Sequence, residues 1–257
     1  MNWVSFEVRN RIAYITINRA EKRNALSPEL VAELTQSFEN AKADTTVKVV
    51  VLKAAGEVFS AGADLAYLQQ LQTNSFEDNI QDSESLKNLF YTIYSLPKTV
   101  IAQVEGHAIA GGCGLASICD IVFAVPEAQF GYTEVKIGFI PALVACFLVR
   151  KLGEGRTKEL LLSGKLISAE TAKAYGLINF VTEKSQIANE VEQYALALAT
   201  ETSAQSVSTT KNLIHQVQQL SLEESLDLAV KLNAEARGTA DCKKGIAAFL
   251  NKEKLSW

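Results

Sequence analysis

Short apolar strand patterns alternate with helical patterns through the first part of the sequence, and this alternation limits the choice of fold. Val4, Phe6 and Val8 share one face of a predicted strand, and residues 13–17 repeat the period of two after a turn at 9–11. Further buried strands are predicted at residues 48–54, 100–104 and 121–125. Because parallel strands separated by helices are joined by right-handed crossovers, the sequence predicts an α/β domain.

The helices carry recognisable start and stop signals. Ser27-Pro28 predicts an N-cap followed by proline at the first helical position. In the second half, residues 185–250 have a helical apolar period, and Ser168 and Gly176 mark the start and end of an earlier helix. The sequence therefore predicts an α/β core followed by a helical C-terminal region.

Composition excludes several classes of protein. The chain has 257 residues and 48% of them are hydrophobic, which is enough for a large core and too many for a disordered chain. A net charge of -4 argues against nucleic acid as the main partner, since duplex binding requires a basic surface. The two histidines, His107 and His215, cannot build a multi-histidine metal centre, so no metal is expected.

Cysteine usage and the lengths of the apolar runs indicate a cytoplasmic protein. Cys113, Cys119, Cys146 and Cys242 show no C-x-x-C spacing, and we expect them to be buried thiols. The N-terminal residues show no basic region followed by an apolar stretch, so no secretory signal is predicted. Apolar runs such as 139–149 are too short to span a bilayer, so no membrane partner is expected.

Two segments rich in small residues each follow a predicted strand. Residues 106–113 begin like a phosphate-binding loop but lack its Lys-Ser/Thr, and residues 112–117 lack the third glycine of a dinucleotide fingerprint. Both nucleotide interpretations are therefore excluded. Residues 59–65 repeat the arrangement of strand, small-residue turn and helix. Two such turns are either tight connections or a pair of backbone N–H donors aimed at one developing oxyanion.

The order and spacing of five motifs resemble those of the crotonase family, the enoyl-CoA hydratase/isomerase superfamily. The motifs are Arg23-Asn24-Ala25-Leu26, residues 59–65, residues 106–115, Cys119-Asp120 and residues 132–138. The resemblance covers nearly the whole chain. It implies a ββα spiral core at residues 1–195 and a C-terminal helical region at 196–257 that forms homotrimers, or hexamers as dimers of trimers.

The resemblance also implies acyl-CoA substrates, with coenzyme A as part of the substrate and no separate cofactor. By position, the amides of Ala63 and Gly111 would grip the thioester carbonyl. The further positions carried over as substrate-binding are Lys22, Ala25, Ala61, Asp64, Leu65, Gly114 and Tyr132. Basic residues near the C-terminus, with Lys22-Arg23, are candidates for contact with the CoA phosphates.

The acid and base positions of the family are only half occupied. Family hydratases use two glutamates, and the second corresponds to Glu134, whereas the first corresponds to Gly114, which cannot transfer a proton. Glu134 is either a general acid/base with a pKa raised by the apolar residues Phe130, Ile137 and Phe139, or a surface carboxylate paired with Lys136.

Two reactions fit this pattern. A single carboxylate suffices for a Δ3,Δ2-enoyl-CoA isomerase, because it can take a proton from one carbon and return it to another. Residues 59–70 and 133–142, however, resemble a bacterial branch of 3-methylglutaconyl-CoA hydratases, which act in leucine breakdown. We therefore favour hydration of a short or branched enoyl-CoA, with 3-methylglutaconyl-CoA as the favoured substrate. A catalytically silent acyl-CoA-binding or scaffold paralogue is the alternative from another class.

A polar, acidic segment at residues 74–85 allows two interpretations, a solvated loop or a mobile flap beside the site. Asp82 and Glu84 within it, or the carboxylate of the substrate itself, are candidates for the missing second group. Tyr67 and Tyr132 are candidates for the lining of the acyl pocket.

Overall fold

The computed structural model describes residues 3–257, except for the side chain of Leu65. A six-stranded sheet has the order β1-β2-β3-β5-β7-β10, and a four-stranded sheet has the order β4-β6-β8-β9. The strands of the first are β1 (Val4–Arg9), β2 (Ile12–Ile17), β3 (Val49–Ala54), β5 (Thr99–Val104), β7 (Ile121–Ala124) and β10 (Phe180–Val181). Those of the second are β4 (Val58–Ser60), β6 (His107–Ile109), β8 (Gln129–Gly131) and β9 (Ile167–Ser168).

The large sheet confirms the predicted strands. β1 and β2 form an antiparallel hairpin whose turn residues Asn10 and Arg11 have φ values of 51° and 65°, and the sheet continues in parallel from β2 through β10. Every residue of β5 is buried, as expected for a central parallel strand.

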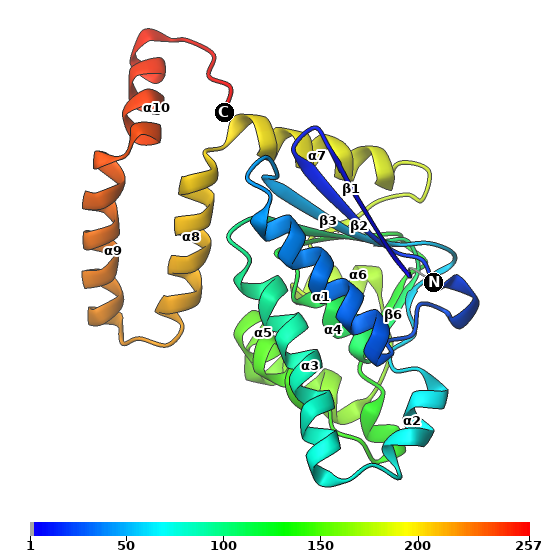
Figure 1. Cartoon of the computed structure of the whole chain (residues 1–257). Coiled ribbons are helices and arrows are strands. Elements are labelled where there is room, and N and C mark those ends of the chain that lie inside the picture. Colours follow the sequence, from blue (N-terminus) through cyan, green and yellow to red (C-terminus); the bar gives the residue numbers. More distant parts are fainter. Residues whose placement is uncertain (1–2) are drawn as a thin grey trace.

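Helices cover both faces of this sheet, with α7 (Ile187–Glu201) on one side and α1 (Pro28–Ala43) on the other (Figure 1). α1 begins at the predicted cap, where Ser27 Oγ accepts a hydrogen bond from the Leu30 N–H at 3.4 Å. Its apolar face is fully buried, which fixes the helix beneath β1 and β2.

Residues 74–85 are not a loop. Ser75 caps α3 (Phe76–Ser95) and exchanges hydrogen bonds with Asp78 in a capping box, so most of the acidic segment forms the first turns of a 20-residue helix. The helix is exposed at its start and buries Leu89, Phe90 and Ile93 near its end.

The remaining helices of the core are α2 (Leu65–Leu71), α4 (Gly111–Ser117), α5 (Ala142–Ser163) and α6 (Ala169–Tyr175), with the 3-10 turns η1 (Ala20–Lys22) and η2 (Glu134–Ile137). α6 starts at Ser168 and ends at Gly176, as predicted. Cys113 and Cys119 are buried, but Cys146 is exposed and Cys242 partly exposed, so the prediction of buried thiols is wrong for these two. They lie on outward faces of α5 and α10.

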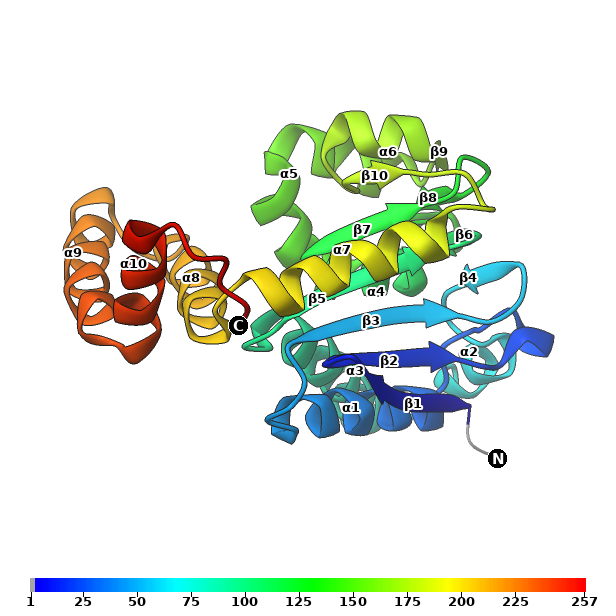
Figure 2. The same cartoon turned by 90° about the horizontal axis from the view of Figure 1, so that it is seen from above.

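Three C-terminal helices form an arm that stands away from the core: α8 (Ala204–Val217), α9 (Leu222–Gly238) and α10 (Ala240–Asn251) (Figure 1 and Figure 2). Lys211 of α8 ties the arm to the core through Asp120 Oδ2 at 2.6 Å and the Lys98 carbonyl at 3.1 Å. Residue 195, the predicted boundary, lies within α7. In the described residues, no helix is long and apolar enough to cross a bilayer.

Candidate active site

The two small-residue turns lie side by side because the strands before them are neighbours. β4 and β6 pair in parallel, so residues 61–64 and 110–111 leave the sheet at the same edge. Gly62 has a φ of 91°, and a Cβ there would lie 2.9 Å from the Ala110 Cβ and 3.1 Å from the Ile109 carbonyl oxygen. Glycine at position 62 therefore permits the close approach of the two turns.

The amide of Ala63 is directed away from the protein backbone that flanks it. The Gly62 carbonyl accepts from the Leu26 N–H at 2.7 Å, and the Asp64 N–H donates to the Leu26 carbonyl at 2.9 Å. In a trans peptide the C=O and N–H point in opposite directions. The Ala63 N–H, which shares its peptide with the Gly62 carbonyl, therefore points away from Leu26.

The amide of Gly111 follows the same logic. The Ala110 carbonyl points into α4, where it accepts from the Gly114 N–H at 3.0 Å, so the N–H of Gly111 points out of the helix start. Ala110 holds a φ of 51° and a ψ of -126°, a conformation that costs energy for a residue with a Cβ. Backbone strain is thus stored at the residue that sets the direction of this amide.

Both turns line one cavity of about 260 Å³. Its apolar wall comes mainly from α1, α2, α3 and the segment after η2. The lining of the cavity includes Leu26, Val31, Ala61, Ala63, Tyr67, Leu68, Asp82, Ser85, Ala110, Gly111, Thr133, Glu134, Ile137 and Phe139.

Glu134 reaches this cavity from η2, directly after β8, the strand that pairs with β6. Its Oε2 atom is buried and has no hydrogen-bond partner within the described residues. Burial raises the pKa of this carboxyl above its usual range, although its own backbone N–H counteracts this in part. No ion pair joins it to Lys136 within the described chain. Ile137 and Phe139 line the cavity beside it, whereas Phe130 does not.

Gly114 does not line the cavity, and the space that a side chain would need is filled. A Cβ at this position would lie 2.5 Å from Val144 Cγ1 and 3.1 Å from Phe90 Cζ. Val144 and Phe90 are both buried. Side chains from α3 and α5 therefore occupy the direction in which a residue at 114 would project.

Two of the other residues predicted to bind substrate have internal partners instead. The ring of Tyr132 is fully buried and its hydroxyl lies 3.0 Å from Ser117 Oγ, behind the cavity. The Asp64 carboxylate forms a 2.9 Å ion pair with Arg19 and caps α2 through the Ala66 N–H. Burial acts to raise the pKa of Asp64, but the amides of Tyr67 and Ala66 and the Arg19 guanidinium outweigh it, and the pKa lies below its usual value.

The acidic segment contributes one residue to the cavity. Asp82 of α3 lines it next to Tyr67 of α2, and burial together with a hydrogen bond to the Asp82 carboxylate raises the pKa of the Tyr67 phenol. Glu84 is exposed and lies 3.6 Å from Lys87. The two predicted candidates thus have different surroundings, because successive helical residues point in different directions.

The remaining predicted binding positions differ in their surroundings. Ala61 lines it and donates its N–H to the Arg23 carbonyl at 3.0 Å, whereas Lys22 is exposed on η1. The Ala25 carbonyl accepts from Arg19 Nη1 at 2.9 Å. The backbone of Leu65 begins α2, and its side chain lies outside the described residues.

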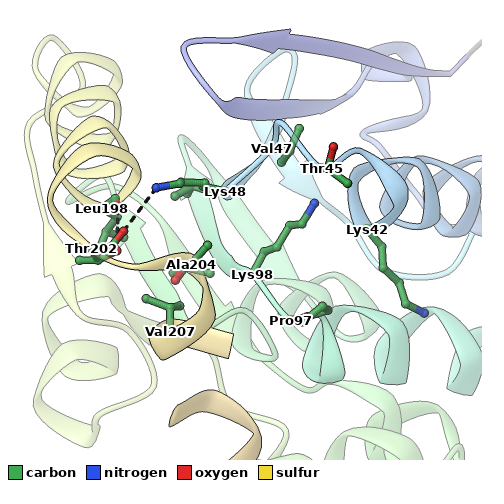
Figure 3. Close-up of a pocket in the computed structure, with 12 residues that line it drawn as sticks. Lys42, Thr45, Val47, Lys48, Pro97, Lys98, Leu198, Thr202, Ala204 and Val207 are labelled. Atoms are coloured by element: carbon green, nitrogen blue, oxygen red, sulfur yellow. Dashed lines mark hydrogen bonds between the residues drawn. The ribbon is translucent and has the colours of Figure 1, made fainter. Parts of the chain in front are cut away.

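A second cavity, of about 280 Å³, opens at the opposite edge of the sheet, where β3 and β5 begin (Figure 3). Lys48 donates to the Thr202 carbonyl at 3.4 Å, and Lys98 donates to the Ala41 and Asp44 carbonyls at 2.5 and 2.6 Å. Burial lowers the pKa of both lysines. Their ammonium groups are bonded to main-chain oxygens, and none of the predicted catalytic or binding residues lines this cavity.

A core of alternating strands and helices, with two neighbouring backbone amides and a buried carboxyl on one cavity, is the arrangement expected of an enzyme of the crotonase fold. The family model for enoyl-CoA hydratase/isomerase matches residues 7–257, and the chain belongs to this family. A Thermus thermophilus protein named "Putative enoyl-CoA hydratase" is 43% identical over 244 residues, which are 95% of this chain and 96% of that protein.

A solved structure and a second named relative support the same family assignment. A crystal structure from Legionella pneumophila, named "putative enoyl CoA hydratase/isomerase (crotonase)", is 35% identical and superimposes with a TM-score of 0.92, over 98% of both chains. The mitochondrial enoyl-CoA hydratase of Pongo abelii is 33% identical over 96% of this chain and 84% of that protein. The predicted α/β fold with a C-terminal helical region is therefore confirmed, and the chain is a member of an enzyme family.

Proposed function

We propose that this protein hydrates a short enoyl-CoA thioester, with Glu134 as the proton donor and the amides of Ala63 and Gly111 as the oxyanion hole. The observation that carries the proposal is the buried, unpartnered Glu134 carboxyl on the same cavity as the two turns. Addition of water to the β-carbon pushes negative charge onto the thioester oxygen. Each well-aimed N–H donor stabilises that charge by about 3 kcal/mol.

The environment of Glu134 suits this role. Protonation of the α-carbon requires the carboxyl to carry its proton, and the raised pKa keeps a larger protonated fraction near neutral pH than an exposed glutamate has. The apolar side chains of Ile137 and Phe139 line the cavity beside this carboxyl.

The cavity favours an uncharged acyl chain. Its described lining holds two carboxyl groups, Glu134 and Asp82, and no lysine, arginine or histidine. The finer prediction from the sequence, 3-methylglutaconyl-CoA, brings a third carboxylate into this space, so a neutral substrate such as crotonyl-CoA is expected to react faster. Hydration rates on these two thioesters test this preference, and faster turnover of 3-methylglutaconyl-CoA would contradict it.

The substitution Glu134→Gln tests the catalytic role. Hydration should fall by about 10²- to 10⁴-fold, the usual contribution of a general acid, while affinity for the acyl-CoA is retained. Glu127→Gln, the same change at an exposed position before β8, is the matched control. Equal hydration rates in Glu134→Gln and wild type would remove Glu134 from the mechanism.

A Δ3,Δ2-enoyl-CoA isomerase is the second candidate, and the filled space at Gly114 favours it, because α4 supplies no second carboxylate. Turnover of a 3-enoyl-CoA without hydration of any 2-enoyl-CoA would support this reaction over hydration. A silent paralogue does not fit the enzyme family to which the chain belongs.

We also propose a homotrimeric assembly, or a hexamer of two trimers, formed through the arm. Support comes from a stripe of exposed apolar side chains on α9 at Leu222, Leu226 and Val230, and from exposed Phe249 and Leu250 on α10. Apolar surface of this extent is typical of a subunit interface.

A further inference from the structure

We propose that Asp82, with Tyr67 on the same cavity wall as a positioning residue, is the second catalytic group of the hydration reaction and binds the water that attacks the β-carbon. This inference rests on the proposed hydratase function and assigns the role that Gly114 leaves open.

Helix α4 cannot supply the second catalytic group. Gly114 has no side chain, and Val144 and Phe90 fill the space around its Cα. The second group must therefore come from another part of the cavity lining. Besides Glu134, the described lining contains one carboxylate, Asp82.

The other polar side chains of the lining are already engaged or less suited. Ser27 caps α1 through the Leu30 N–H, and Ser85 Oγ donates to the Gln81 carbonyl at 3.0 Å. Thr133 adjoins Glu134 in the chain, so it lies on the same wall as the proton donor. Asp82 comes from α3, which supplies a separate part of the lining.

Tyr67 is the neighbour of Asp82 on the cavity. The phenol of Tyr67, on α2, lines the same cavity as Asp82, and the Asp82 carboxylate contributes to raising the pKa of the phenol. Both residues are half-buried. The carboxylate oxygens of Asp82 and the lone pairs of the phenol can accept hydrogen bonds from a water molecule in the cavity. The raised pKa of Tyr67 keeps it a donor at all working pH values.

The reaction balances with these groups. The water oxygen forms a bond to the β-carbon as one of its protons passes to the Asp82 carboxylate. The electron pair of the carbon–carbon double bond moves to the thioester oxygen, held by the two amides, and then returns to bond the α-carbon to the proton of Glu134. Asp82 releases its proton to solvent and Glu134 takes one up, so one H and one OH are added. Tyr67 keeps its proton and acts as a positioning residue.

The test compares two reactions of the same protein. Hydration of crotonyl-CoA requires the water-binding group, whereas exchange of the α-protons of butyryl-CoA with D₂O requires only Glu134 and the amides. Asp82→Asn should lower the hydration kcat by about 10²-fold or more and leave the exchange rate within about threefold. Tyr67→Phe should lower the hydration kcat by about tenfold, with KM and exchange nearly unchanged.

Glu84→Gln is the matched control, because Glu84 lies on the same helix but is exposed beside Lys87. It should leave both reactions unchanged. Hydration within twofold of wild type in Asp82→Asn, or an equal loss of hydration and exchange, would overturn the role of Asp82. Absence of hydration in the wild-type protein, with exchange intact, would instead overturn the proposed hydratase function and this inference with it.

Discussion

Glu134 illustrates at the scale of a residue how a site useful for proton transfer weakens the fold. Because its pKa is raised in the folded protein, the folded state binds a proton more tightly than the unfolded chain. The Glu134 carboxyl therefore contributes most to stability at pH values below the ordinary pKa of glutamate. This contribution is lost as the pH rises through the raised pKa of the folded state.

This linkage predicts the stability of Glu134→Gln. At pH 8 the variant should melt at a higher temperature than wild type, because it has no buried charge, and the gap should narrow at pH 4.5. Thermal unfolding of both proteins at the two pH values measures this. A gap of the same size at both pH values would show that ionisation of Glu134 is not its cause; Glu127→Gln should show none.

The close packing at Gly114 makes a second prediction. Gly114→Ala places a Cβ 2.5 Å from Val144 Cγ1, and overpacking of this kind costs about 1–3 kcal/mol of unfolding free energy. Val144→Ala removes that contact, so the double variant Gly114→Ala/Val144→Ala should be more stable than the sum of the two single effects predicts. Urea unfolding of the four proteins measures the coupling. Additive effects would mean that the site relaxes without Val144.

What the sequence can predict of the site differs from residue to residue. Glu134, Ala63 and Gly111 were carried over by motif position, and the structure brings all three to one cavity. Tyr132 and Asp64 stand in the same motifs, but motif position does not tell which way a side chain points, and their partners Ser117 and Arg19 lie 15 and 45 positions away.

At the scale of the element, the ion pair between Arg19 and Asp64 joins the loop around η1 to the start of α2. Both side chains are about nine-tenths buried, so removal of one partner leaves the other charge buried and unpaired. Asp64→Ala should therefore cost about 3 kcal/mol or more, including the loss of the cap.

The double variant Arg19→Ala/Asp64→Ala is the control, and it should lose less unfolding free energy than the sum of the two single losses.

The stabilisation that Asp64 provides depends on pH with the opposite sign to that of Glu134. Since the pKa of Asp64 is lowered by folding, its stabilisation is present above the ordinary pKa and is lost as pH falls through the depressed one. Chemical unfolding at pH 7 and pH 3 should show the Asp64→Ala deficit shrinking at pH 3; an undiminished deficit would contradict the charge argument.

Elements were predictable where local chemistry marks their ends. Ser27-Pro28 marked the start of α1, and Ser168 with Gly176 marked both ends of α6. Residues 74–85 were misread because the first turns of α3 are exposed, so they lack an apolar period even though Ser75 and Asp78 form a capping box. The polar composition of this segment indicated only that it is exposed to solvent, and an exposed segment can be helical.

At the scale of the whole molecule, the core and the arm differ in how much of their apolar surface is buried. The core buries its central strand β5 completely, whereas none of the residues of α8 and α9 is buried. An arm that meets the core mainly through Lys211 and neighbouring residues of α8 leaves its own apolar stripe open to a second surface.

The apolar stripe of α9 therefore predicts the assembly state. Leu226 and Val230 are 58% and 69% exposed and lie four positions apart on one helix face. Leu226→Glu/Val230→Glu introduces charge into the proposed interface and should reduce the particle from three or six chains to one, as measured by light scattering after gel filtration.

Lys173→Glu, on the exposed side of α6, is the control and should leave the mass of the particle unchanged. A monomeric wild-type protein, or a double variant that keeps its full mass, would show that the arm is not the interface and that its apolar face serves another contact.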